Sequence, residues 1–235
     1  MGAKEVLISG KSSFKIEVPY KLVETGAKGK KPLIVYLHGY NQNLVYFEKK
    51  MEEMLDVRAY HLFIQAPYPI YNKNRERTVA QWGRAWYLYD GRQDQFVKSM
   101  ERASQFIQDT LDSVSGAIEI NRYCIFGYSM GGYLGGYFAF SRWKYISDLI
   151  VVGGRIKTEV FEGKRARASH INVLALHGKK DDSVLAEPQK KEISLLAKEG
   201  FSAEFRVIDE GHRLTTEYVS EARQWLLQNG YFLVD

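Results

Sequence analysis

A serine stands between two glycines at Gly127-Tyr128-Ser129-Met130-Gly131, and a strand-like segment leads directly into it. Residues 123–126 are β-branched or aromatic, with the small Cys124 among them, and predict a strand, whereas residues 132–140 are small or apolar and predict a helix packed on a sheet. A strand-to-helix turn this tight holds its serine at strained backbone angles, exposes the hydroxyl, and leaves no room for side chains at the flanking glycines. The helix N-terminus then favours negative charge at the serine. The pattern predicts a reactive serine, with an ordinary glycine-rich turn as the alternative.

The composition is that of an ordinary globular chain, because 45% of its 235 residues are hydrophobic and 26% are charged. This length predicts one α/β domain over residues 1–235 with a sizeable core. The net charge of +5 is mild. Short basic clusters at residues 28–31 and 164–167 are expected to be solvated loops, since no nucleic-acid-binding motif accompanies them. We therefore expect no nucleic-acid partner.

No segment has the features of a targeting signal or a membrane span. The N-terminus lacks a long apolar stretch, and Val6 stands where a myristoylation signal needs Ser or Thr. The single cysteine, Cys124, is interpreted as a small buried side chain rather than a reactive thiol. The sequence predicts a cytoplasmic protein without membrane insertion and leaves the oligomeric state open.

Strands and helices alternate along the chain, which predicts a mostly parallel sheet with helices on both faces. An antiparallel hairpin is expected at residues 5–9 and 14–19. Further strands are expected at residues 33–37, 62–65, 123–126, 149–152, 173–176 and 203–208. Helices are expected at residues 45–55, 96–111, 132–140 and 216–228, and residues 68–92 are expected to be irregular. Residues 153–169 are too few to hold a large lid.

A serine hydroxyl needs a base to take its proton and an acid to orient that base. For a serine on such a turn, the acid and then the histidine follow in the chain. Asp181 and His212 occupy those places, each after a predicted strand, and parallel strands bring such loops to one edge of the sheet. Asp182 competes with Asp181, but the His-Gly-x-x-Asp spacing with Val184 three residues further favours Asp181.

Other histidines and acids fit these places less well. Asp209 and Glu210 lie too close to His212 in the sequence. His61 is expected to begin a strand, His170 lies in a loop before Asp181, and His38 and His177 belong to His-Gly turns, where the imidazole braces a loop more often than it reacts.

Two backbone N–H groups are needed to stabilise the negative charge that develops on an attacked carbonyl. One is expected from Met130, directly after the serine. The other is expected from Tyr40, which follows His38-Gly39 at the end of the strand at residues 33–37.

These segments together resemble the phospholipase/carboxylesterase group of α/β-hydrolases, which includes the acyl-protein thioesterases. The resemblance is carried by Leu37-His38-Gly39, Gly127-Tyr128-Ser129-Met130-Gly131-Gly132, His177-Gly178-x-x-Asp181-x-x-Val184 and Gly211-His212, and more loosely by Ala66-Pro67 and Arg84-Ala85-Trp86-Tyr87. It extends from about residue 33 to the final helix and implies the α/β-hydrolase fold. Two departures change the pocket wall: Tyr40-Asn41-Gln42-Asn43 replaces the usual Gly and Asp, and Met130 replaces the frequent Gln.

Aromatic residues gather where the substrate is expected. Binding sites are mostly apolar walls with a few polar groups. The residues expected to bind substrate are Trp82, Trp86, Tyr87 and Tyr128, with Tyr40, Tyr46, Tyr68, Tyr71 and Tyr89 nearby. With little lid, this wall predicts a preference for short acyl or aryl esters over long lipids.

The sequence thus predicts a serine hydrolase that cleaves carboxylic esters of small molecules, with thioesters as a further option, through an acyl-enzyme. No cofactor or metal is expected, since the histidines show no ligand spacing. Two alternatives stay open: a serine peptidase or amidase on the same scaffold, and a receptor of the same fold that does not turn over.

Overall fold

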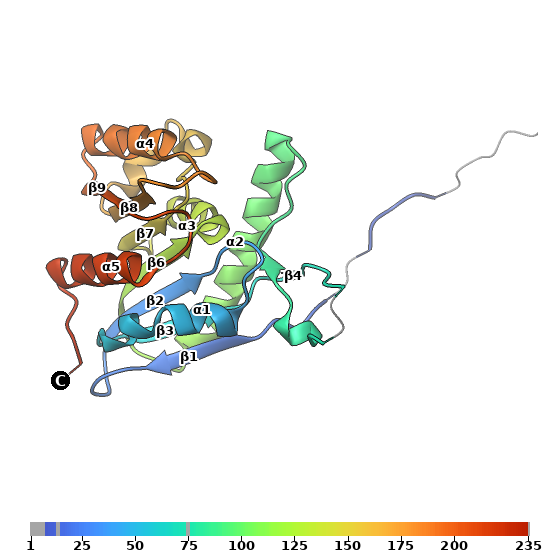
Figure 1. Cartoon of the computed structure of the whole chain (residues 1–235), viewed down its shortest axis with the longest axis horizontal. Coiled ribbons are helices and arrows are strands. Elements are labelled where there is room, and N and C mark those ends of the chain that lie inside the picture. Colours follow the sequence, from blue (N-terminus) through green and yellow to red (C-terminus); the bar gives the residue numbers. More distant parts are fainter. Residues whose placement is uncertain (1–7, 13–14, 74–75, 235) are drawn as a thin grey trace, which may run out of the picture.

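The computed structural model describes residues 8–12, 15–73 and 76–234. Their main sheet has seven strands in the order β1-β3-β2-β6-β7-β8-β9 (Figure 1). Only the pairing of β1 with β3 is antiparallel, and the other neighbours in this sheet run parallel. The strands are β1 (Tyr20–Glu24), β2 (Lys31–Leu37), β3 (Tyr60–Ile64), β6 (Ile120–Tyr128), β7 (Asp148–Val152), β8 (Asn172–Gly178) and β9 (Ala203–Ile208).

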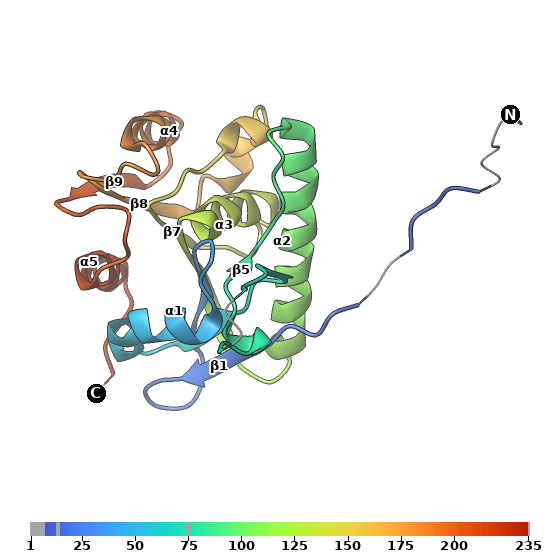
Figure 2. The ribbon, with the colours of Figure 1, turned by 45° about the vertical axis from the view of Figure 1, so that its right-hand side comes forward.

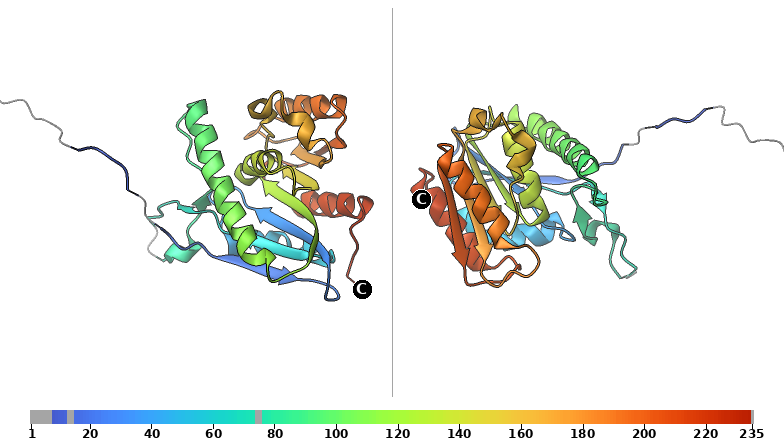
Figure 3. Two further views of the ribbon diagram at one scale, coloured as in Figure 1. Left: turned by 180° about the vertical axis from the view of Figure 1, so that it is seen from behind. Right: turned by 90° about the horizontal axis from the view of Figure 1, so that it is seen from above.

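Helices cover both faces of this sheet, so its central strands are buried on both sides. Figure 2 shows α1 and α5 on one side and α2 and α3 on the other, and the long α2 crosses the back of the sheet in Figure 3. Burial on both faces explains the continuous apolar runs of β2 and β7. The helices are α1 (Leu44–Lys50), α2 (Gln93–Ser115), α3 (Met130–Ser141), α4 (Ala186–Lys198) and α5 (Thr216–Gln228), and the 3₁₀ helices are η1 (Glu52–Asp56), η2 (Val79–Gln81), η3 (Thr158–Phe161) and η4 (Arg165–Ala168).

The strand register brings the segments that follow the central strands to one edge. Leu37 of β2 pairs with Gly127 of β6, and Val152 of β7 pairs with both Tyr128 of β6 and Leu176 of β8. The residues after these strands therefore meet at the carboxyl edge of the sheet. This is the usual place for a binding site in an open α/β sheet.

The predicted mostly parallel sheet is confirmed, but the N-terminal hairpin and one helix differ from the expectation. The N-terminal hairpin falls partly outside the described residues. Residues 8–12 and 15–19 form no strand, and the first described strand is β1, which pairs with β3. The helix α4 was not expected. It has a polar sequence with Pro188 in its first turn, where a missing N–H costs nothing.

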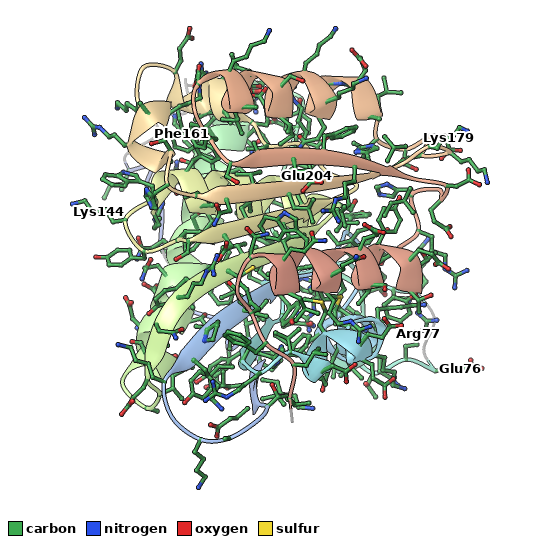
Figure 4. The ribbon with its side chains drawn as sticks, turned by 90° about the vertical axis from the view of Figure 1, so that its left-hand side faces the viewer. Glu76, Arg77, Lys144, Phe161, Lys179 and Glu204 are labelled. Atoms are coloured by element: carbon green, nitrogen blue, oxygen red, sulfur yellow. The ribbon has the colours of Figure 1, made fainter. Side chains whose placement is uncertain are left out.

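The irregular stretch before α2 contains a small hairpin of β4 (Tyr68–Pro69) and β5 (Arg84–Ala85), with η2 between them. Main-chain hydrogen bonds join this hairpin to the loop after β2, because Asn41 N–H donates to Arg84 O (3.0 Å) and Arg84 N–H donates to Gln42 O (2.9 Å). In Figure 4, Arg77 of this stretch lies on the same side of the molecule as Lys179, directly after β8, and Lys144 lies on the opposite side. The stretch therefore lies at the carboxyl edge.

Candidate active site

Ser129 occupies a strained turn between β6 and α3. Its φ of +52° lies in the left-handed region that non-glycine residues rarely adopt. A Cβ at Gly127 would overlap the carbonyl of Gly131, and a Cβ at Gly131 would overlap the carbonyl oxygen of Leu37. Both glycines are therefore required for α3 to begin this close to β6 and β2.

The hydroxyl of Ser129 contacts the imidazole of His212, which follows β9. The distance from Ser129 Oγ to His212 Nε2 is 2.9 Å, and that from His212 Nδ1 to Asp181 Oδ2 is 2.8 Å. With the proton on Nδ1, the ring donates to the carboxylate and accepts from the serine hydroxyl. The structure thus brings together three side chains that lie up to 83 positions apart in the sequence.

Asp181 is held as a buried anion. Its side chain is fully buried, and its Oδ1 accepts the N–H groups of Ser183 (3.0 Å) and Val184 (2.9 Å). Burial alone would raise the pKa of Asp181, but the hydrogen bonds from Val184, His212 and Ser183 outweigh it and lower the pKa. Asp182 is exposed, and its Oδ1 accepts from the Ser183 hydroxyl (3.3 Å).

The other histidines make different contacts, although His177 Nε2 also lies 3.6 Å from Asp181 Oδ2. Burial lowers the pKa values of His38 and His61 to about 4. His38 Nε2 accepts the N–H of Ala66 (3.1 Å), so it braces the loop after β2. The buried His177 donates from Nε2 to the carbonyl of Val184 (2.7 Å), next to the backbone that holds Asp181.

The N–H groups expected to bind an oxyanion lie on two adjoining segments. Met130 begins α3, and Tyr40 follows Gly39 in the loop after β2. Within the described part of the chain, neither N–H donates a hydrogen bond. Gln42 fixes the loop by accepting the Gly39 N–H at its Oε1 (2.9 Å), a contact that no sequence signal had indicated.

Three of the four residues expected to line the substrate site are buried instead. Trp86 is fully buried, and its Nε1 donates to the carbonyl of His38 (2.7 Å), so it supports the loop after β2 from within the core. Tyr87 packs edge-on against Phe96 in the core. Tyr128 is 6% exposed. Core contacts leave these three side chains little exposed surface, and their role in substrate binding stays a prediction.

Trp82 remains half-buried in the stretch at the carboxyl edge, where its ring meets the exposed Tyr71 edge-on at 5.3 Å. Tyr40 is 60% exposed and Tyr46, in the first turn of α1, is 43% exposed. These side chains offer the aromatic surface that the buried ones do not.

A glycine pair that the sequence did not single out borders the histidine. Gly153, after β7, has a φ of +53°, and a Cβ there would approach the His212 ring to 3.4 Å and Asp181 Oδ2 to 3.6 Å. A Cβ at Gly154 would lie 3.0 Å from the carbonyl oxygen of Ser129, so this glycine lies against the main chain of the serine. The two adjacent glycines were the available signal in the sequence, but only the strand register places them here.

The parallel sheet, its flanking helices and the serine turn define an α/β-hydrolase. Among the described residues, no cluster of three or more His, Cys, Asp or Glu side chains could hold a metal ion, and no helix has the length and apolar character needed to cross a membrane.

The chain belongs to the phospholipase/carboxylesterase family, which its sequence matches over residues 18–229. It is accordingly a serine hydrolase of the carboxylesterase type. No curated protein sequence matches it.

Solved structures share the fold. Acyl-protein thioesterase 2 of Zea mays is 22% identical, with a TM-score of 0.70 over 90% of this chain and 98% of its own. Esterase PE8 is 19% identical, with a TM-score of 0.75 over 91% and 99%. A carboxylesterase of Mesorhizobium loti is 16% identical, with a TM-score of 0.65 over 89% and 94%.

Proposed function

We propose that this protein hydrolyses carboxylic esters through an acyl-enzyme on Ser129. The observation that carries the proposal is the continuous set of contacts from Ser129 through His212 to the buried Asp181. A nucleophile, a base and an orienting acid at hydrogen-bond distance are what acyl transfer requires.

In this mechanism His212 takes the serine proton as Ser129 Oγ attacks the acyl carbonyl. His212 then protonates the leaving group, and Asp181 stabilises the imidazolium. The N–H groups of Tyr40 and Met130 hold the oxyanion, at the positive end of α3. Water activated by His212 releases the acid and restores the serine, so the reaction needs no cofactor.

We propose a small-molecule ester with a short acyl or aryl group as the substrate. Support comes from the exposed Tyr40, Tyr46 and Tyr71 and the half-buried Trp82, and from residues 153–169, which contain only the short η3 and η4. A thioester is compatible with the same chemistry. A cytoplasmic location remains part of the proposal.

The test is active-site labelling combined with steady-state kinetics. A fluorophosphonate probe should label the wild type at one site and leave Ser129→Ala unlabelled, and kcat/KM for aryl esters should fall as the acyl chain lengthens. Labelling that persists in Ser129→Ala would refute the nucleophile. A burst of product without turnover would favour the receptor, and faster cleavage of peptide amides than of esters would favour the peptidase.

A further inference from the structure

Two buried tyrosine hydroxyls hold consecutive carbonyls of the loop that carries His212. Tyr128 donates to the carbonyl of His212 (2.6 Å), and Tyr218 donates to the carbonyl of Gly211 (2.9 Å). The two residues are 6% and 1% exposed and belong to the same core cluster. A buried tyrosine hydroxyl normally finds a hydrogen-bond partner. Here both partners are backbone atoms beside one functional side chain.

Tyr128 links three parts of the site. It directly precedes Ser129, and its ring centre lies 5.6 Å from that of His212. A Cβ at Gly39 would lie 2.8 Å from the same ring, so the glycine lets the loop with Tyr40 pack against it. Burial raises the pKa of Tyr128 to about 12, with an opposing hydrogen bond from the Leu214 N–H, so the hydroxyl keeps its proton and donates.

Tyr218 reaches the same loop from α5. A Cβ at Gly178 would overlap the Tyr218 hydroxyl and the carbonyl of Glu210. Because Gly178 at the end of β8 has no side chain, Tyr218 can lie between the loop of Asp181 and the loop of His212. Burial also raises the pKa of Tyr218, so its hydroxyl stays protonated.

We infer that Tyr128 and Tyr218 are positioning residues that fix the His212 imidazole between Ser129 and Asp181. The inference rests on the proposed function. Without either hydroxyl, a part-buried carbonyl loses its donor, and the loop shifts to regain one. The serine-to-imidazole contact must stay within about 2.6–3.2 Å to transfer a proton, and a displacement of about 1 Å costs about 10²-fold in rate.

The experiment compares Tyr128→Phe, Tyr218→Phe and the double variant with the wild type. We expect kcat to fall about 10- to 100-fold in each single variant with KM within about twofold, because the chemistry and not substrate binding is disturbed. The rate of fluorophosphonate labelling should fall in proportion. Thermal unfolding establishes that each variant is folded at the assay temperature.

Tyr231→Phe is the matched control. Tyr231 is also buried (2% exposed), but its hydroxyl donates to Asp148 Oδ2 (2.7 Å) at the first residue of β7, at the opposite edge of the sheet. The Tyr231→Phe variant should have a lower melting temperature but an unchanged kcat and labelling rate.

Wild-type kcat and labelling rate in folded Tyr128→Phe and Tyr218→Phe would overturn the inference. An equal fall of kcat in Tyr231→Phe would also overturn it, since the effect would then be a general loss of stability. Labelling that persists in Ser129→Ala would overturn the proposed function as well. If labelling requires Ser129 but is as fast in the two tyrosine variants as in the wild type, the positioning role alone is refuted and the proposed function stands.

Discussion

Replacement of Asp181 by Asn is expected to inactivate the enzyme through the tautomer of His212. The Asp181 carboxylate offers one oxygen to the N–H groups of Ser183 and Val184 and the other to His212. An amide has a single oxygen. If that oxygen faced His212, two backbone donors would lose their acceptor, at about 1–3 kcal/mol each. The oxygen will therefore stay with the backbone, and the NH₂ group will face His212.

His212 Nδ1 must then accept a hydrogen bond, so the ring proton moves to Nε2, which faces Ser129. A ring protonated there cannot take the serine proton. The same substitution in a serine-protease triad lowers kcat about 10⁴-fold, which corresponds to about 5.5 kcal/mol of transition-state stabilisation. We expect a loss of this size in kcat/KM, measured with a chromogenic aryl ester.

Asp182→Asn is the control. Asp182 is exposed and accepts a side-chain hydrogen bond from Ser183, so kcat/KM should stay within about twofold of wild type. The reasoning is refuted if Asp181→Asn keeps kcat/KM within about tenfold of wild type. It is equally refuted if the two variants lose the same amount.

Three further predictions follow from burial and close packing. Trp86→Ala should cost about 3–5 kcal/mol in the free energy of unfolding, measured by chemical denaturation, because the side chain is fully buried. Trp82 is half-buried, so Trp82→Ala should cost much less and should instead alter the preference for acyl length. The reverse outcome would show that Trp86 lines the substrate site. Burial, and after it the charge of Glu159, raise the pKa of Glu192 above its ordinary 4.5. Above about pH 4.5 the folded state keeps a proton that the unfolded state has lost, so stability should fall as the pH rises towards the folded pKa. If Glu192→Gln does not flatten the dependence of the melting temperature on pH, this prediction is contradicted. Gly131→Ala should abolish soluble, active protein, because its Cβ would overlap a main-chain oxygen at the end of β2. Gly116 has open space around it, so Gly116→Ala should behave as wild type in expression and ester hydrolysis. An active Gly131→Ala variant would show that α3 can shift.

Local sequence patterns predicted the fold because parallel sheets bring distant loops together in a regular way. The apolar runs of β2, β6, β7 and β8 were predicted close to their observed positions, and so were β9 and α5. Once the strands run parallel, the segments after them share one edge, whatever the lengths between them. The order Ser129, Asp181, His212 could therefore be proposed from the sequence, and the structure places these side chains in contact.

Spacing favoured Asp181 over Asp182 without being able to exclude either. The two neighbours differ in what surrounds them, because one carboxylate is buried under His212 and two N–H groups and the other faces solvent. The two N–H groups belong to the neighbouring Ser183 and Val184, but His212, which covers the carboxylate, lies about 30 residues further along the chain. Sequence spacing contains no such information.

The sequence by itself determined the parallel sheet and the strained serine turn, because both depend on short-range patterns of apolar residues and glycine. Only the tertiary structure decided which aromatic side chains are exposed. Trp86 and Tyr128 stand in the segments where a substrate wall was expected, yet their polar atoms bond to carbonyls of His38 and His212 and their rings are buried. Burial is set by whatever packs from elsewhere in the chain, so aromatic residues that look alike in the sequence can line a site or support it from beneath.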